Sequence, residues 1–399
     1  MGKGKTASKA PGSWLKSAAE EPTTTTKHKA KHKRLKTMAE LADKHQLYQQ
    51  AVQKPRKEVR NLDTIYRKLC ARHLDHATKK QSVSLDSTES ADSGLDEDPL
   101  HGHRRHALTM REDFCGTAVL CAEWVRADST PERCAYGVDI DKSVVDYAME
   151  HTVGGVGHHE SSLGSRIKLL CADVMAVKGV GSTDEEVSGL CVPRVDIIAS
   201  LNYAMCYFHQ RRDLIRYLKH SLENLNDFGL LFCDIFGGME ATKSGISNVR
   251  DLGNFKYYFN QHSYDLMSNT IRFSLGFKMR DGSVLKNCFS YEFRVYTISD
   301  LKEAMLEAGF DDVSVWISPR NKDSGDDSDE DDRARDIDEE SDGESGASED
   351  EEEDARDDDQ DHGHAGHSGF EAFTEMKTRM EMPYAFNAYV VGIKLPKTH

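Results

Sequence analysis

The stretch Met110 to Thr117 (MREDFCGT) places two carboxylates, Glu112 and Asp113, directly before a small turn at Cys115-Gly116-Thr117. An apolar approach precedes the acids, and a helical pattern follows the turn. In a doubly wound sheet, the first strand-to-helix turn is where a ligand approaches the backbone, and glycine permits that approach. Adjacent acids would repel a phosphate, so this turn favours a ligand without phosphate and with a cationic end.

A third acid, Asp139, follows Gly116 by 23 residues, at the end of the strand-like run Ala135 to Asp139. An acid at about this spacing accepts hydrogen bonds from the hydroxyls of a ribose. The two features together predict a nucleoside ligand. The G-x-G-x-x-G pattern that dinucleotide enzymes use around pyrophosphate is absent, which disfavours a nicotinamide dehydrogenase. The opening MGKGKT is not a P-loop, because its spacing of glycines is wrong.

The elements that must position these residues alternate between short apolar runs and helical periodicity. Further strands are expected at 167–171, 195–200 and 229–235, with helices after Asp141 and over 214–225. Near-continuous apolar strands separated by amphipathic helices indicate a parallel sheet that is covered on both faces.

The pattern then changes to an antiparallel one. Apolar residues alternate over 271–279 and again over 285–295, and Asp281-Gly282 between them predicts a type I′ hairpin turn. Thr297 and Asp300 resemble a capping box for a helix over 301–308, and final strands are expected at 313–317 and 388–393. Because the hairpin follows the last parallel strand, we expect it to stand over the carboxyl edge as a lid.

Charge is concentrated in segments that do not look folded. The chain has 399 residues and a net charge of −16, of which the stretch 322–361 alone contributes −19 through 23 acids and 4 bases. Such composition cannot bury enough apolar surface to fold. We therefore expect a disordered basic tail (1–38), N-terminal helices docking on the core (39–79), a disordered Ser/Asp-rich linker (80–104), a core with a hairpin lid at 255–297 (105–320), a disordered acidic insertion (321–369) and a final core strand (370–399).

These residues resemble the motifs of a known family. The chain resembles class I S-adenosylmethionine (AdoMet)-dependent methyltransferases and, more narrowly, the poorly characterised group marked by LREDFCGT, read here as MREDFCGT. The similarity extends through KHQLYQQAVQKP (44–55), CADV (171–174), ASLNY (199–203), GLLFCDIFGG (229–238), YEFRVYTISDLKEAMLEAGF (291–310) and AYVVG (388–392).

The resemblance implies a Rossmann-like α/β fold with a seven-stranded sheet, in which five parallel strands are joined by an antiparallel end pair, and AdoMet as the cofactor across the first turn. Glu112 would orient the methionine end, and Asp139 would bind the ribose. The implied cofactor-binding residues are Glu112, Asp113, Phe114, Cys115, Gly116, Thr117, Asp139, Ile140, Asp173 and Val174 (both for the adenine), Leu201 and Tyr48.

The turn departs from the family pattern of an acid followed by three alternate glycines. It reads Glu112-x-Phe114-x-Gly116-x-Ala118, so one glycine of three is kept. This leaves the register of the acid open, with Asp113 as an alternative to Glu112.

Asn202 and Tyr203 are the candidate catalytic residues. They stand where aminomethylating relatives carry an Asn/Asp-Pro-Pro-aromatic motif, but both prolines are missing, so a capping or packing role is an equal alternative. Tyr48 would lie over the cofactor, as N-terminal helices do in relatives similar to glycine N-methyltransferase. Its alternative is core packing.

Other sequence features limit the cellular setting. Nine cysteines without CxxC spacing suit free thiols in a reducing compartment, so a cytoplasmic or nuclear location is expected. No run is apolar enough for a membrane span. The histidine groups 101–106 and 362–367 lack the context of a metal site, so no metal is expected. The basic run KHKAKHKRLK (27–36) is a solvated tail, a nuclear-import signal or a contact for nucleic acid or an acidic partner.

The sequence thus predicts an AdoMet-dependent methyltransferase with an unknown acceptor, and an aromatic lid favours a small molecule. The alternatives are an RNA or protein methyltransferase, or an AdoMet-binding interaction module without catalysis.

Overall fold

The computed structural model describes residues 35–85, 107–127, 133–154, 163–180, 190–320, 372–377 and 379–397. Most of the expected basic tail, the greater part of the linker, the acidic insertion and both histidine groups lie outside the described residues. No described helix combines the length and apolar character needed to cross a membrane.

The main body is a mixed, mostly parallel sheet with strand order β13-β12-β14-β7-β6-β1-β2-β3. Strands β3, β2, β1, β6 and β7 are parallel, while β14 is antiparallel to β7 and to β12. Its strands are β1 (Thr109–Asp113), β2 (Cys134–Asp139), β3 (Ile167–Cys171), β6 (Val195–Ser200), β7 (Leu225–Gly237), β12 (Asp312–Arg320), β13 (Thr374–Glu375) and β14 (Ala385–Ile393). The expected Rossmann-like α/β class is confirmed, and the two-residue β13 adds an eighth strand to the expected seven.

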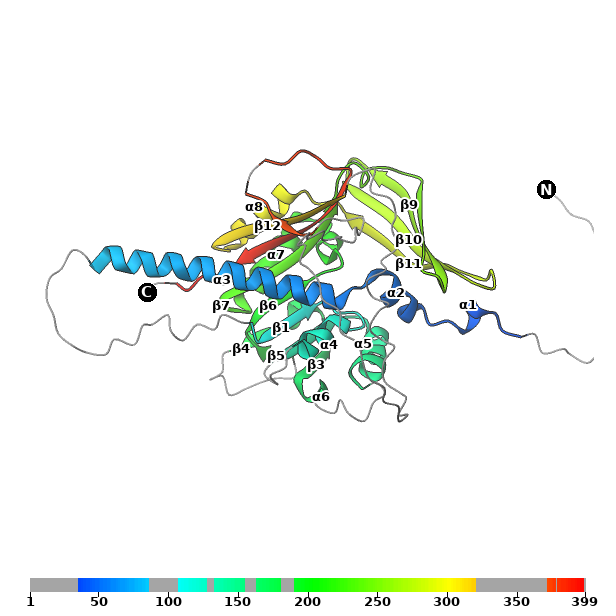
Figure 1. Ribbon diagram of the computed structural model, residues 1–399, viewed down its shortest axis with the longest axis horizontal. Coiled ribbons are helices and arrows are strands. Elements are labelled where there is room, and N and C mark those ends of the chain that lie inside the picture. The colour runs from blue at the N-terminus through cyan, green and yellow to red at the C-terminus, as the bar shows by residue number, and fades with distance from the viewer. Residues whose placement is uncertain are drawn as a thin grey trace, which may run out of the picture.

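Helices cover both faces of this sheet (Figure 1). One apolar cluster joins β1 and β7 to α3 (Pro55–Leu85) and α4 (Val119–Arg126) through residues such as Leu62 and Trp124. The other joins the opposite face to α7 (Arg211–Glu223) and α8 (Ile298–Ala308). The remaining elements are α5 (Lys142–Ala148), α6 (Leu163–Arg166), the π-turn η1 (Met149–Val153), the 3-10 turns η2 (Val174–Ala176) and η3 (Ala204–Tyr207), and the short parallel pair β4 (Lys178–Val180) and β5 (Cys191–Pro193).

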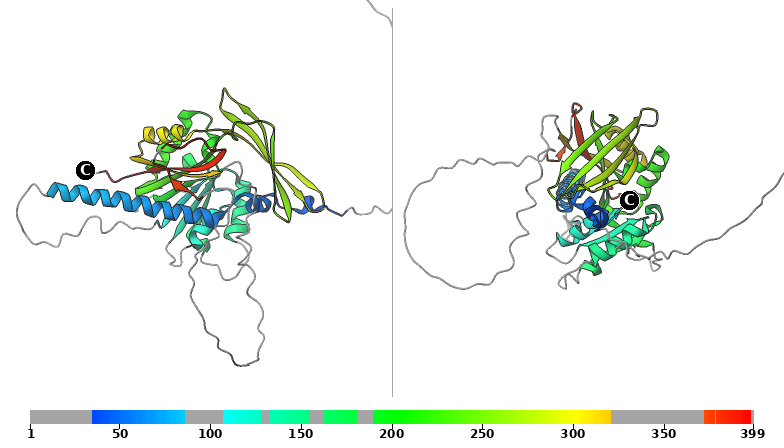
Figure 2. Two further views of the ribbon diagram at one scale, coloured as in Figure 1. Left: turned by 45° about the horizontal axis from the view of Figure 1, so that its top comes forward. Right: turned by 90° about the vertical axis from the view of Figure 1, so that its right-hand side faces the viewer.

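The expected hairpin lid is half of a larger structure. A second, antiparallel sheet has the order β11-β10-β9-β8, with β8 (Ile246–Asp251), β9 (Phe255–Asp265), β10 (Thr270–Met279) and β11 (Val284–Arg294). It stands beside the α/β core with one broad face turned away from it (Figure 2). The inner face packs on η3, where Tyr207 lies 4.8 Å from Phe293 between ring centroids. This sheet therefore lies over the carboxyl end of β6.

Local signals explain several boundaries and correct others. The capping box of Thr297 and Asp300 starts α8, and Gly309 ends it at φ 108°, as expected. The turn at Asp281-Gly282 is not type I′, because only Gly282 has a positive φ (81°). Two hydrogen bonds, from Gly282 N to Met279 O and from Met279 N to Ser283 O, instead form a three-residue loop with glycine in the left-handed position.

The N-terminal helices join the two sheets. Helix α1 (Met38–Leu41) contacts the β10–β11 turn, and α2 (Lys44–Val52) packs Leu47 and Ala51 on Phe255 and Phe277 of the second sheet. Helix α3 then crosses the main sheet and continues to Leu85, six residues past the helical region expected from sequence.

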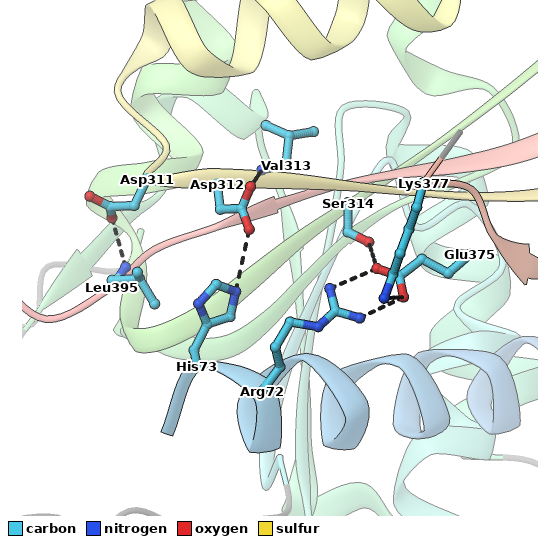
Figure 3. A network of polar contacts seen from close by, with 9 residues as sticks. All are labelled: Arg72, His73, Asp311, Asp312, Val313, Ser314, Glu375, Lys377 and Leu395. Atoms are coloured by element: carbon cyan, nitrogen blue, oxygen red, sulfur yellow. Dashed lines mark hydrogen bonds and ion pairs between the residues drawn. The ribbon is translucent and has the colours of Figure 1, made fainter. Parts of the chain in front are cut away.

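A polar network fixes α3 to the sheet edge (Figure 3). The Arg72 guanidinium donates to both carboxylate oxygens of Glu375 at 2.7 and 2.5 Å, and Ser314 Oγ donates to Glu375 at 2.9 Å. Lys377 lies 3.6 Å from the same carboxylate, and His73 lies 3.5 Å from Asp312. Glu375 belongs to β13, so this network joins the helix to the chain that re-enters the core after residue 371.

We expect Arg72→Ala to lower the free energy of unfolding by about 1–2 kcal/mol, because a bidentate, partly buried pair is lost. Arg67→Ala is the matched control, since Arg67 forms a more exposed pair with Asp63, and it should cost about 0.5 kcal/mol or less. Denaturant unfolding of the two variants measures this, and equal losses would show that the pair on β13 does not hold α3.

Candidate functional site

The turn between β1 and α4 has an unusual backbone. Phe114, Gly116 and Ala118 all have positive φ angles, of 60°, 51° and 55°. For residues other than glycine this conformation costs roughly 1–2 kcal/mol each, and such strain concentrates at functional sites. A side-chain carbon added at Gly116 would meet no atom within 4 Å. The space next to Gly116 is therefore open. The turn has three residues with positive φ angles, and only one of them is a glycine.

Asp139 holds this turn from the end of the neighbouring strand. Its Oδ2 accepts from Gly116 N at 2.9 Å, and its Oδ1 accepts from Asp141 N at 2.9 Å. Thr117 is tied on the other side, where its carbonyl accepts from Thr152 Oγ1 at 2.8 Å and its hydroxyl donates to Gln53 at 3.5 Å. The first and second strand ends are thus brought together as the sequence predicts.

The two acids of the turn face opposite sides of β1. Asp113 is fully buried and accepts from Arg111 Nε at 2.8 Å and Nη2 at 3.0 Å. Its second oxygen also accepts from Tyr217 of α7 at 2.8 Å. Both oxygens of Asp113 are therefore engaged in a contact on the α7 side of the sheet.

Glu112 lies on the other face, beside the start of α4. It is 3% exposed, and its Oε2 accepts from Cys121 N at 3.2 Å and from Cys121 Sγ at 3.1 Å. Burial raises the pKa of Glu112 to about 8; the hydrogen bonds from Cys121 act in the opposite direction, and the charge of Asp139 adds to the rise. No basic side chain in the described part of the chain pairs with this carboxyl, so it is a buried acid suited to a cationic partner.

The ends of β2 and β3 present acids beside an apolar side chain. Ile140, next to Asp139, is 73% exposed, which is unusual for a large aliphatic residue. Asp173 is exposed and accepts from Met175 N at 2.9 Å, while Val174 is buried. Ala172 N donates to Asp139 O at 2.9 Å, so these strand ends are adjacent. The surface therefore places carboxylates that can accept hydrogen bonds from hydroxyl groups beside an apolar side chain.

The loop after β6 has a second strained backbone. Leu201 is buried, and the next two residues, Asn202 and Tyr203, have positive φ angles of 59° and 61°. Asp234 of β7 fixes them by accepting from Asn202 N at 3.0 Å and from Tyr203 N at 2.7 Å. Burial raises the pKa of Asp234 to about 8; the Tyr203 amide opposes this rise, and the charge of Glu58 reinforces it.

Tyrosine side chains from four parts of the chain gather beside this loop. Burial raises the pKa of Tyr48 on α2, and the charges of Tyr257, Tyr207 and Tyr203 raise it further. The pKa of Tyr207 is raised by burial and by the charges of Tyr291 and Asp139. These hydroxyls remain protonated at neutral pH, and they extend from the inner face of the second sheet to the acid at the end of β2.

Several of these residues were not predicted from sequence. Asp234 interrupts the apolar run GLLFCDIFGG, where a lone acid is a recognisable signal. Tyr207 and Tyr291 carry no local signal, because only the folding of the second sheet over η3 brings them together. Of the residues that the sequence singled out, Tyr203 and Tyr48 pack in this cluster, whereas Asn202 is exposed beside Tyr203.

No protein-family model matches the sequence, and no curated protein matches it. Among solved structures, the chain is similar to an S-adenosylmethionine-dependent methyltransferase from Clostridium acetobutylicum, with 13% identity over 72% of this chain and 84% of that one and a TM-score of 0.41. It is also similar to CalS10, an amino pentose methyltransferase from Micromonospora echinaspora, with 12% identity, coverage of 72% and 94% and a TM-score of 0.44. A third is the CcbJ methyltransferase from Streptomyces caelestis, with 12% identity, coverage of 52% and 78% and a TM-score of 0.41. Similarity at this level does not assign a function.

The raised pKa of Glu112 gives a testable dependence of stability on pH. Folded Glu112 keeps a proton that the unfolded chain loses above the ordinary pKa of 4.5, so the contribution of Glu112 to stability falls as pH rises from about 5 to about 8. Glu112→Gln lacks this loss, and its amide oxygen can still accept from Cys121. Relative to the wild type, the melting temperature of the variant should therefore rise between about pH 5.5 and about pH 8. The exposed Glu303→Gln is the control, and a difference that does not change with pH would contradict the assignment.

Proposed function

We propose that the chain is an AdoMet-dependent methyltransferase. One observation supports this proposal. An open turn, in which three residues have left-handed backbone angles, lies between the buried acid Glu112 and Asp139, the acid expected to bind a ribose. A dinucleotide would place its pyrophosphate at this turn, beside the buried carboxyl of Glu112. That carboxyl has no positive charge with which to bind an anion. A nucleoside with a cationic tail matches both ends of the site.

The residues fit such a cofactor one by one. The buried Glu112, which pairs with no described base, would gain an ammonium partner, and that pairing would lower its raised pKa. Asp139 would accept from ribose hydroxyls, and the exposed Ile140 would cover one face of the adenine. Asp173 and Val174 would contact the adenine edge, while Phe114, Cys115, Gly116, Thr117 and Leu201 would shape the floor. We assign Asp113 a structural role instead, because Arg111 and Tyr217 occupy its oxygens.

AdoMet supplies a methyl group that its sulfonium already activates, so the protein's main task is to align an acceptor and exclude water. Asn202 and Tyr203 are proposed to orient the acceptor, since Asp234 fixes the backbone of both. The clustered tyrosines keep their protons at neutral pH and act as hydrogen-bond donors and aromatic surfaces, not as bases.

The acceptor is proposed to lie between this loop and the inner face of the second sheet. That face is lined by aromatic side chains of β9, β10 and β11, and α2 adds Tyr48. Such a surface suits a small, partly apolar or amine-bearing molecule. One alternative is an RNA or protein acceptor that the basic N-terminal segment would bind. Another is that the chain binds AdoMet without catalysing methyl transfer.

Incubation of a cell lysate with methyl-labelled AdoMet tests the proposal. The wild-type protein should transfer label to the small-molecule fraction, and Asp139→Ala should reduce that label at least about tenfold by removing ribose contacts. Asp146→Ala is the matched control, because Asp146 lies on α5 and forms an exposed ion pair with Lys142. Label in RNA or protein alone would overturn the choice of acceptor. No transfer to any fraction, with AdoMet bound, would favour the module without catalysis.

A further inference from the structure

The second sheet contains a large bulge on its outward face. Leu275 pairs with Phe289 and Phe277 pairs with Leu285, so the single residue Gly276 of β10 faces three residues of β11. A side-chain carbon at Gly276 would come within 2.9 Å of Leu285 O, and Asn287 in the bulge has a φ of 50°. Bulges of this kind redirect side chains and recur beside functional sites.

The bulge closes one side of a cavity of about 320 Å³. Its polar lining consists of Tyr258 and Asn260 from β9, Lys278 from β10, and Lys286 and Asn287 from β11. Strand alternation puts Gly276 and Lys278 opposite the apolar face that packs on α2, so this cavity opens away from the tyrosine cluster. It is a separate site from the one proposed for methyl transfer.

Every polar group that lines the cavity can donate a hydrogen bond. Ser247 Oγ donates to Asn260 Oδ1 at 2.7 Å, and Ser274 Oγ donates to Asn287 Oδ1 at 2.9 Å, which leaves the amide nitrogens of both asparagines as donors. Within the described chain, neither Lys278 nor Lys286 forms an ion pair, and none of the lining residues is acidic. A cavity with two ammonium groups, two amide donors and no carboxylate suits an anion.

The lining also contains the aromatic ring of Tyr258 and the apolar residues Phe277, Val284 and Leu285. Tyr258 pairs with Gly276 on one side, which has no side chain to cover it, and its ring stacks on no other ring among the described residues. Aromatic rings on the face of an antiparallel sheet stack well with unpaired bases, whose phosphates then reach nearby lysines. The volume is at the lower end of the range for ligand sites and suits one nucleotide.

The most basic segment of the chain ends at this same sheet. Met38 N donates to Asp281 Oδ2 at 2.8 Å and Ala39 N donates to Ser283 Oγ at 3.0 Å, so the chain is fixed to the β10–β11 turn immediately after residues 27–36. That ten-residue run contains six Lys or Arg residues. A polyanion bound at the cavity would therefore lie close to the C-terminal end of the basic run.

We propose that the outward face of the second sheet binds single-stranded nucleic acid, with a base on Tyr258 and phosphates at Lys278 and Lys286. This partner uses the ring, the amide donors and the lysines together. The acidic stretch 322–361 of the same chain could neutralise the lysines but has no aromatic base for Tyr258, so it is the less suitable occupant. The proposal concerns binding alone and stands apart from the methyl-transfer proposal.

Fluorescence anisotropy with a labelled oligouridylate of about 12 nucleotides tests it on the full chain at about 50 mM salt. Wild type should bind at protein concentrations below about 100 µM. Lys278→Glu with Lys286→Glu should weaken binding at least about tenfold and make the salt dependence shallower by about 1.4, at roughly 0.7 per lost phosphate contact. Lys219→Glu with Lys302→Glu, exposed on α7 and α8, changes the charge equally and should weaken binding less than about threefold.

A second pair of variants separates stacking from charge. Tyr258→Ala should weaken binding about tenfold, whereas Tyr258→Phe should bind like the wild type. If the charge-reversed pair does not fold, Lys278→Gln with Lys286→Gln takes its place and should weaken binding at least about threefold. Absence of binding by the wild type, or equal losses in the two charge-reversed pairs, overturns the proposal. Carbodiimide cross-links from Lys278 or Lys286 to residues 322–361, without RNA binding, would assign the cavity to the chain's own acidic stretch.

Discussion

The hydrogen bond from Gly116 N to Asp139 joins the first strand-to-helix turn to the end of the second strand, and the proposed ligand site is built around that bond. It holds a turn in which Phe114 and Ala118 adopt backbone angles that glycine accepts more easily. The parallel pairing of β1 with β2 and β6 places this turn between the other strand ends, and Glu112 caps α4 behind it. The turn therefore adopts left-handed backbone angles at Phe114 and Ala118 without glycine at either position.

Charge distinguishes the α/β core from the outward face of the second sheet. In the core, Glu112 of β1 and Asp234 of β7 are acids whose pKa values burial raises to about 8, and both accept hydrogen bonds from backbone amides. Carboxyls in such surroundings gain stability from a cationic ligand such as a sulfonium nucleoside or an amine. On the outer side, Lys278 and Lys286 line a cavity without an acid. The core and the outward face of the second sheet are thus suited to ligands of opposite charge.

Much of the fold could be predicted because it depends on local pattern. The runs 167–171 and 195–200 match β3 and β6 residue for residue, because both are short and mostly apolar even though Lys168 and Asp196 interrupt them. Strand β8 was missed because it is a largely exposed edge strand without apolar alternation, and Leu225 belongs to β7 although its spacing continues the leucines of α7. Whether Glu112 or Asp113 is available to bind the ligand depends on which face of the main sheet α7 covers. No local sequence pattern indicates that face. The same holds for Asp234, whose role depends on a loop more than thirty residues away in sequence.

We propose that AdoMet binds at the turn from Phe114 to Ala118. Amide hydrogen exchange over 112–122, with and without saturating ligand, tests it most directly, because the amides of the turn would be shielded by the cofactor. We expect AdoMet and S-adenosylhomocysteine to slow exchange at this turn and around Asp139, and NAD to leave it unchanged. Unchanged exchange with AdoMet, or equal slowing by NAD, would contradict it.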